Sequence, residues 1–192
     1  NNWFLKIFIW KQEKTVILIS GGDWIKGLDV LIEALSIIGK IKLNKVKLVI
    51  VDNNHSDYYY QDVKQLLEVE VIQWLPHIKF LDQINSSDVV IIPSYCETLS
   101  FVAVQCMAYK KPFICSDTVG ITDYLPEELK SKLVFKNKSA KELSGLIEKF
   151  LDYQNEYKLV GEKLYHIYKT EFSLRVFSSR FIELLNKEGV NS

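Results

Sequence analysis

Cysteine, proline and methionine are scarce in this sequence. Its 192 residues include three Cys, four Pro and one Met. The cysteines are odd in number and form no C-x-x-C pair, which argues against a disulfide framework or a thiolate zinc site. We expect Cys96, Cys106 and Cys115 to be reduced thiols in a cytoplasmic protein, the last two of them within the core.

Net charge and long apolar runs are also lacking. The 24 basic residues balance the 24 acidic ones, and the pI is near 7.0. This balance argues against the basic surface of a nucleic-acid-binding protein. No apolar run approaches the roughly 20 residues of a membrane-spanning helix. The histidines His55, His77 and His166 lack the spacing of metal ligands, and we expect them on the surface or in loops.

The N-terminal residues 1–13 contain an apolar, aromatic stretch that is interrupted by Lys6. It has neither the basic start nor the cleavage site of a signal peptide. We interpret residues 1–13 as an edge strand or an interdomain stub, with a peripheral membrane contact as the alternative. The chain begins with Asn rather than Met, so we expect it to be a fragment, with residues 14–192 forming one domain.

Apolar, β-branched runs alternate with stretches of helical spacing. This alternation predicts an α/β fold with a doubly wound parallel sheet, followed by a C-terminal helical tail. The predicted strands cover residues 15–19, 46–51, 71–72, 89–92, 113–115 and 133–135. The predicted helices cover residues 27–38, 60–68, 80–84 and 99–109, and two further apolar helical faces lie near residues 143–151 and 174–185.

The segment 93–117 is the most informative part of the chain. The strand predicted at 89–92 ends at Pro93-Ser94, and the carboxylate of Glu97 follows in a short polar loop before an apolar helix. In open α/β sheets, ligands bind at the carboxyl ends of the strands, beside helix N-termini. Glu97 therefore marks a candidate binding site.

Three segments in this order resemble the C-terminal, donor-binding domain of a retaining GT-B glycosyltransferase of the group 4 class. Residues 21–34 resemble its first strand-turn-helix with a Lys-Gly pair, residues 87–94 its strand ending in Pro-Ser, and residues 97–108 its E-x7-E motif. The resemblance runs from about residue 14 to residue 150. It implies a Rossmann-like half of a GT-B fold.

The resemblance also implies a function. A nucleotide-sugar would donate its sugar, with retention of configuration, to an acceptor held by an N-terminal domain of the same parent protein. It implies no metal and no cofactor, and it suggests a setting in bacterial polysaccharide or glycoconjugate assembly. We expect a cytoplasmic protein, or one peripheral to the inner face of the membrane, and a chain that transfers little by itself.

The expected roles follow from the charge of such a donor. Its diphosphate needs a cation and free N–H groups, and cleavage builds positive charge on the sugar and negative charge on the phosphate. Lys26 offers the cation, and Gly22 lies in the turn before it. A helix N-terminus offers the N–H groups. Its turn consists of Thr98, Leu99, Ser100 and Phe101.

By the resemblance, Glu97 is the catalytic residue and contacts the transferred sugar. The alternative for Glu97 is a carboxylate that is stabilised by the helix N-terminus and has no ligand. The alternative for Lys26 is a solvated lysine at the start of a helix.

The sequence departs from the family pattern at three places. Gln105 stands where the family has a second Glu, which contacts the ribose; Gln keeps one carbonyl acceptor but loses the charge. Ser100 replaces a glycine, and the arginine that usually assists the lysine is missing, since Arg175 and Arg180 lie far along the chain. These departures leave two alternatives open: a catalytically degenerate partner module of an active homologue, and a nucleotide-sugar epimerase of the same architecture.

Overall fold

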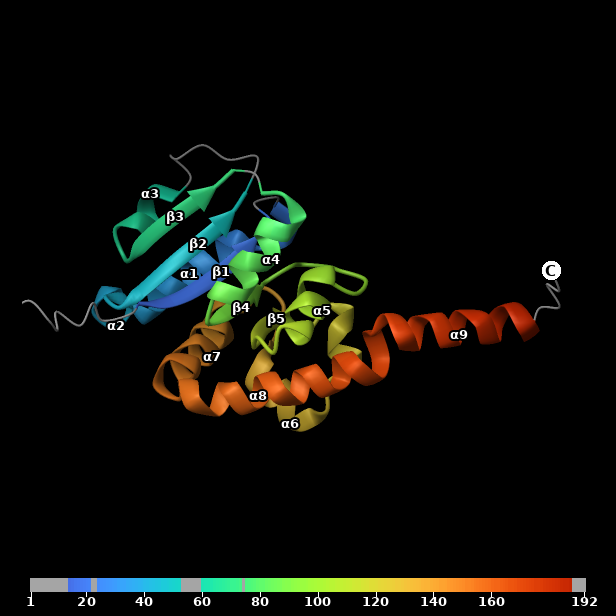
Figure 1. Ribbon diagram of the computed structural model, residues 1–192. Helices are drawn as coiled ribbons and strands as arrows, with labels where there is room; N and C mark the ends of the chain where they lie inside the picture. The colour runs from blue at the N-terminus through green and yellow to red at the C-terminus, as the bar shows by residue number, and fades with distance from the viewer. Residues whose placement is uncertain (1–13, 22–23, 53–59, 74, 188–192) are drawn as a thin grey trace, which may run out of the picture.

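A computed structural model describes residues 14–21, 24–52, 60–73 and 75–187. These residues form a six-stranded parallel sheet with the strand order β3-β2-β1-β4-β5-β6 (Figure 1). This is the strand order of the Rossmann fold, in which the winding reverses between β1 and β4. The predicted doubly wound parallel sheet is confirmed. The strands are β1 (Thr15–Ser20), β2 (Val46–Val51), β3 (Glu68–Ile72), β4 (Val89–Ile92), β5 (Phe113–Ser116) and β6 (Val134–Phe135).

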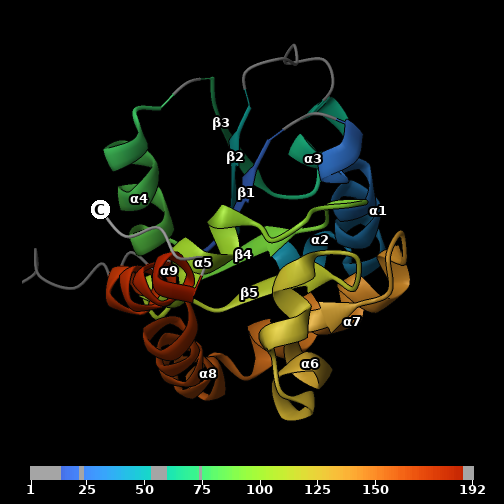
Figure 2. The ribbon, with the colours of Figure 1, turned by 90° about the vertical axis from the view of Figure 1, so that its right-hand side faces the viewer.

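Helices cover both faces of the sheet (Figure 2). The helices α1 and α7 pack together on one face, and α4, α5 and α8 lie on the other. The predicted C-terminal helical tail is also confirmed. In chain order the helical segments are the 3₁₀ turn η1 (Trp24–Lys26), α1 (Leu28–Ile38), α2 (Lys40–Leu43), α3 (Gln61–Lys64), α4 (His77–Ser86), α5 (Phe101–Ala108), the 3₁₀ turn η3 (Gly120–Tyr124), α6 (Glu127–Leu133), α7 (Ala140–Asp152), α8 (Gln154–Ile167), the π-helical turn η4 (Tyr168–Phe172) and α9 (Leu174–Lys187).

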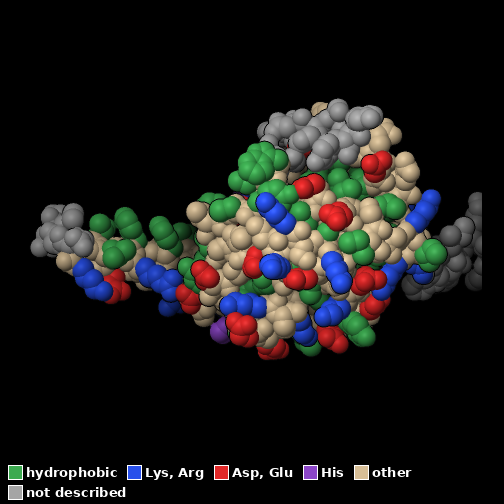
Figure 3. Space-filling view, turned by 180° about the vertical axis from the view of Figure 1, so that it is seen from behind, with side chains coloured by type: hydrophobic (Ala, Val, Ile, Leu, Met, Phe, Trp, Pro, Cys, Tyr) green, Lys and Arg blue, Asp and Glu red, His purple; other side chains and the backbone are tan. Residues whose placement is uncertain are grey.

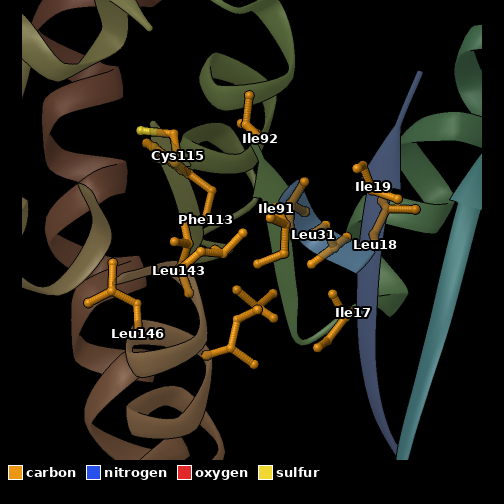
Figure 4. Packing of buried hydrophobic residues seen from close by; sticks show 14 of the residues in the cluster. Ile17, Leu18, Ile19, Leu31, Ile91, Ile92, Phe113, Cys115, Leu143 and Leu146 are labelled. Atoms are coloured by element: carbon orange, nitrogen blue, oxygen red, sulfur yellow. The ribbon is translucent and has the colours of Figure 1, made fainter. Parts of the chain in front are cut away.

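The hydrophobic core lies between the central strands and the helices that cover them. All four residues of β4 and all four of β5 are buried, as expected for central strands of a parallel sheet that is covered on both faces. Figure 4 shows Ile17 of β1, Leu31 of α1, Ile91 of β4 and Leu143 of α7 converging in this core. The core thus holds β1 and β4 rigidly beside each other, at the point where the winding reverses.

The edge of the sheet at β3 differs from the prediction. The helix predicted over residues 60–68 is too long, because α3 ends at Lys64 and β3 already begins at Glu68. The strand begins at Glu68 because Glu68–Ile72 pair in parallel with Lys47–Val51 of β2, and Lys47 also lies 2.6 Å from Glu70 across the two strands. Charged and apolar residues alternate in β3, so this half-exposed strand carries its charges on one face.

The cysteines and the described histidines lie where the sequence predicts. Cys106 and Cys115 are buried, and Cys96 is exposed. Burial raises the pKa of both the Cys106 and the Cys115 thiols well above the ordinary range. Both His77 and His166 are exposed. The predictions for His55 and for residues 1–13 concern residues outside the described part of the chain.

The last helix, α9, extends away from the sheet and its covering helices (Figure 1). Its apolar side chains gather along one side, while its Lys and Arg side chains gather on another (Figure 3). The apolar side chains of α9 are nevertheless exposed: Phe177 keeps 63% and Leu174 keeps 77% of its accessible surface. Among the described helices, none combines the length and apolar character needed to cross a bilayer.

Candidate functional site

The loops that follow β1 and β4 meet at the carboxyl edge of the sheet. Gly27, between η1 and α1, has a φ of 66°. It packs so closely on the end of β4 that a Cβ atom there would lie 2.0 Å from the carbonyl oxygen of Pro93. The N–H group of Tyr95 also donates to the carbonyl of Ile25 across 2.8 Å. Only glycine fits position 27, and these contacts bring the end of η1 against the loop after β4.

The loop after β5 holds the backbone of Glu97. Glu97 forms an isolated parallel bridge with Val119. Its N–H group donates to the carbonyl of Thr118 across 3.3 Å, and its carbonyl accepts from the N–H group of Gly120 across 2.9 Å. A Cβ atom on Gly120 would lie 1.9 Å from the carbonyl oxygen of Thr98, so a larger residue does not fit there.

Two hydroxyl groups reinforce this contact between loops. The Ser116 hydroxyl donates to the carbonyl of Ser94 across 2.5 Å, and the Thr118 hydroxyl donates to the same carbonyl across 3.2 Å. Ser94 and Ser116 are buried, so these hydrogen bonds satisfy groups that water does not reach. The position of Glu97 is thus fixed by β4 on one side and by the loop after β5 on the other.

The side chains of Lys26 and Glu97 form an ion pair at this edge. Lys26 Nζ contacts Glu97 Oε1, and the two side chains keep 33% and 20% of their accessible surface. The second carboxylate oxygen, Glu97 Oε2, is buried and has no hydrogen-bond partner among the described residues. A buried carboxylate oxygen without a donor is costly, which marks this oxygen as an acceptor for a ligand group.

A cavity of about 70 Å³ lies beside the ion pair. It has room for about two water molecules at ~30 Å³ each, and therefore for a phosphate oxygen or a sugar hydroxyl rather than for a whole nucleotide. The lining residues are Gly21, Lys26, Ile91, Ile92, Pro93, Ser94, Glu97, Ser100 and Val102.

Ser100 forms the start of α5 at the wall of this cavity. Its hydroxyl oxygen accepts a hydrogen bond from the N–H group of Ala103 across 3.4 Å, which makes Ser100 the N-cap of the helix. Its φ is 75°, a value that favours glycine. The N-terminus of α5 therefore points its positive end toward the cavity, at the cost of backbone strain at Ser100.

A larger groove of about 700 Å³ lies between α4, α5 and α9. Its size is that of a small-molecule site, and its walls are mostly apolar. Gln105 is half-buried and lines this groove together with Leu99 and Phe101. Gln105 does not line the cavity that Lys26 and Glu97 share.

The structure thus brings together three of the residues that the sequence singles out: Lys26, Glu97 and Ser100. Leu99, Phe101 and Gln105 lie in the groove, and Thr98 is exposed on the loop between them. Gly22 lies outside the described residues.

Sequence reasoning missed two residues that hold Glu97 in place, Thr118 and Gly120. The only sequence signal for them is a glycine shortly after the predicted strand at 113–115. Such a glycine indicates a close backbone approach, but it does not say to which segment.

Fold and site together define a Rossmann-like domain with a cation, a helix N-terminus and a carboxylate around one pocket, a class suited to phosphate-bearing ligands. The family model described as "Glycosyl transferases group 1" matches residues 2–166. The chain belongs to this family of glycosyltransferases.

Known proteins support this assignment. A curated relative is the putative teichuronic acid biosynthesis glycosyltransferase TuaC of Bacillus subtilis, 26% identical over 98 residues, which are 51% of this chain and 25% of that protein. A sucrose-phosphate synthase from Thermosynechococcus elongatus has a similar structure, with a TM-score of 0.75 at 19% identity over 94% of this chain and 47% of that one.

Anabaena HepE, solved in complex with UDP-glucose, has a TM-score of 0.71 at 16% identity over 91% of this chain and 49% of that one. The two structural likenesses show a shared fold. The matched residues span about a quarter of TuaC and about half of each of the two solved structures.

Proposed function

We propose that the chain is the C-terminal domain of a retaining glycosyltransferase and binds its nucleotide-sugar donor. The supporting observation is the meeting of Lys26, Glu97 and the start of α5 in one cavity, between the carboxyl ends of β1 and β4. Ligands bind at this position in sheets of this strand order. Membership of a glycosyltransferase family supports the reaction class.

The charges suit the transfer of a glycosyl group. As the sugar–phosphate bond breaks, the sugar gains positive charge and the leaving diphosphate gains negative charge. Lys26 and the N-terminus of α5 stabilise the diphosphate, with N–H groups from the turn at residues 98–101. Glu97 is the catalytic residue, because its carboxylate faces the sugar and stabilises the positive charge there. We propose that no metal ion or other cofactor takes part.

The nucleoside would occupy the groove beside α5. Gln105 offers a side-chain carbonyl from the wall of this groove, and we propose that it accepts a hydrogen bond from a ribose hydroxyl. The groove is large enough for a nucleoside, whereas the cavity at Lys26 is not. In this proposal the diphosphate lies at the start of α5, between the two spaces.

The acceptor would bind to an N-terminal domain of the parent protein. These relatives are about twice as long as this chain, which leaves room for such a domain. We propose that the chain transfers little by itself, and that the parent protein is cytoplasmic, or peripheral to the inner face of the membrane, and active in polysaccharide assembly.

Mutation of the ion pair in the intact protein tests the proposal. We expect Lys26→Ala and Glu97→Ala each to lower kcat for sugar transfer by roughly 10²–10³-fold, the loss typical of one charge-stabilising group. Lys149→Ala, in the last turn of α7, removes an exposed lysine at the opposite edge and serves as the control. The assay measures release of nucleoside diphosphate and labelled acceptor.

Two outcomes would contradict the proposal. Binding without any transfer favours a degenerate partner module, which the departures at Gln105 and at the missing arginine also suggest. Inversion of the donor sugar without transfer to an acceptor favours an epimerase, and NMR of the recovered sugar separates this case from true transfer.

A further inference from the structure

The Lys26 ammonium, which the diphosphate needs, is already paired with the Glu97 carboxylate, which the sugar needs. Lys26 is the one Lys or Arg among the described residues that line the cavity, and it is bound to Glu97. A diphosphate at the mouth of this cavity meets no other Lys or Arg among the described residues that line it. The Lys26 ammonium has three N–H donors, and each donor that it turns to a phosphate is withdrawn from Glu97, so binding of the phosphates weakens the ion pair.

Glu97 loses its partner when Lys26 turns away. Its Oε2 has no hydrogen-bond donor among the described residues even while the pair is intact. Without Lys26, both carboxylate oxygens would lack a partner in a side chain that is 20% exposed, and a negative phosphate would lie nearby. Leaving a partly buried charge unpaired is strongly unfavourable, and it opposes binding of a diphosphate alone.

A sugar attached to the diphosphate changes this balance. Its hydroxyl groups can donate to the oxygens of Glu97 while the phosphates take Lys26. Both charges then exchange one partner for another, and neither is left unpaired. The sugar-bearing ligand therefore meets less opposition than the free nucleoside diphosphate.

We infer that the ion pair of Lys26 and Glu97 makes the site select an intact nucleotide-sugar over the corresponding nucleoside diphosphate. Glu97 is then a specificity-determining residue as well as a catalytic one, since it disfavours retention of the spent donor. The inference rests on the proposed function, because it assumes that Lys26 holds the diphosphate.

Calorimetric titration of the intact protein with UDP, UDP-glucose, GDP and GDP-mannose tests the inference. We expect the wild type to bind the matching nucleotide-sugar at least about tenfold more tightly than its diphosphate, the effect of one charge-assisted hydrogen bond. In Glu97→Gln, a neutral amide of the same shape leaves Lys26 free. The diphosphate should then bind about tenfold more tightly, and the nucleotide-sugar should gain nothing.

A double variant separates exchange of partners from simple repulsion. In Lys26→Met/Glu97→Gln the gain for the diphosphate should vanish, because it acts through Lys26. If Glu97 merely repels the phosphates, the gain persists without the lysine. Glu148→Gln is the matched control: it removes one charge from a surface pair in which Lys42 lies 3.2 Å from Glu148, and it should change neither affinity.

The outcomes distinguish the inference from the function beneath it. Wild-type binding of a nucleotide-sugar, combined with an unchanged diphosphate affinity in Glu97→Gln, overturns the inference and leaves the proposed function standing. A gain that survives in the double variant overturns it as well. Failure of every variant to bind any of the four ligands overturns both, and thermal melting of each variant checks that it is folded.

Discussion

Gly120 offers the sharpest test of how Glu97 is held, because it lies outside the cavity and touches only backbone. A Cβ atom at this position would lie 1.9 Å from the Thr98 carbonyl oxygen, so in Gly120→Ala that carbonyl must retreat by about 1 Å. Forcing one extra methyl group into a packed contact costs about 1–3 kcal/mol. For a domain of this length, the loss corresponds to a fall in Tm of roughly 2–12 °C.

The same shift displaces Glu97, whose carbonyl bonds to the N–H group of Gly120. A misplacement of about 1 Å at a reacting group can lower a rate about 100-fold. We therefore expect Gly120→Ala to reduce kcat far more than it weakens binding of a nucleoside diphosphate, which depends on Lys26.

Thermal melting and steady-state transfer assays measure the two effects of Gly120→Ala. Gly145→Ala is the matched control, since Gly145 lies inside α7 with no atom within 4 Å of an added Cβ. That change should raise stability by about 0.5–1 kcal/mol and leave activity unaltered. If Gly120→Ala has the same Tm and the same kcat as the wild type, the loop after β5 does not hold Glu97 as described.

Two further predictions concern the loop that carries Glu97 and the buried thiols. Both Ser100→Gly and Ser100→Ala lose the capping hydroxyl, but only glycine relieves the φ of 75°. Ser100→Gly should therefore be more stable than Ser100→Ala by about 1–2 kcal/mol, and equal urea midpoints of the two variants would refute this. Iodoacetamide should alkylate Cys96 alone in the folded chain and all three cysteines in denaturant, because burial raises the pKa of Cys106 and Cys115 and blocks access to them. Intact-mass spectrometry counts the adducts. A second adduct that forms on the folded chain as fast as the first would show that Cys106 or Cys115 is not buried in the core.

Much of the fold could be predicted from the sequence because the central strands are nearly all apolar. Runs such as the one at 89–92 have the length of a strand, and helical spacing follows each of them, so the parallel sheet follows from alternation alone. The start of the edge strand β3 was harder to predict. At Glu68 the local pattern suits a helix, and the ion pairs to β2 that stabilise β3 are invisible until the two strands are paired.

The candidate site could be predicted in part for a topological reason. Lys26 and Glu97 follow neighbouring parallel strands, and the carboxyl ends of such strands share an edge. Their direct contact could not be predicted, because it depends on the approach of Gly27 to Pro93. Nor could the sequence show that Gln105 lines the groove, since the direction of a side chain on α5 depends on how that helix is rotated.

The contacts that build the site are mainly made by backbone atoms. This explains how the fold can be kept when sequence identity is low. Gly27 meets the Pro93 carbonyl, Gly120 meets the Thr98 carbonyl, and Glu97 is bridged to Val119 through its main chain. Such contacts require small residues at two positions and restrict few others. Structures that share 16–19% identity with this chain can therefore keep the same arrangement of strands and loops. In the proposed function the chemistry then depends on a few side chains, above all on the charge of Glu97 and the position of Lys26.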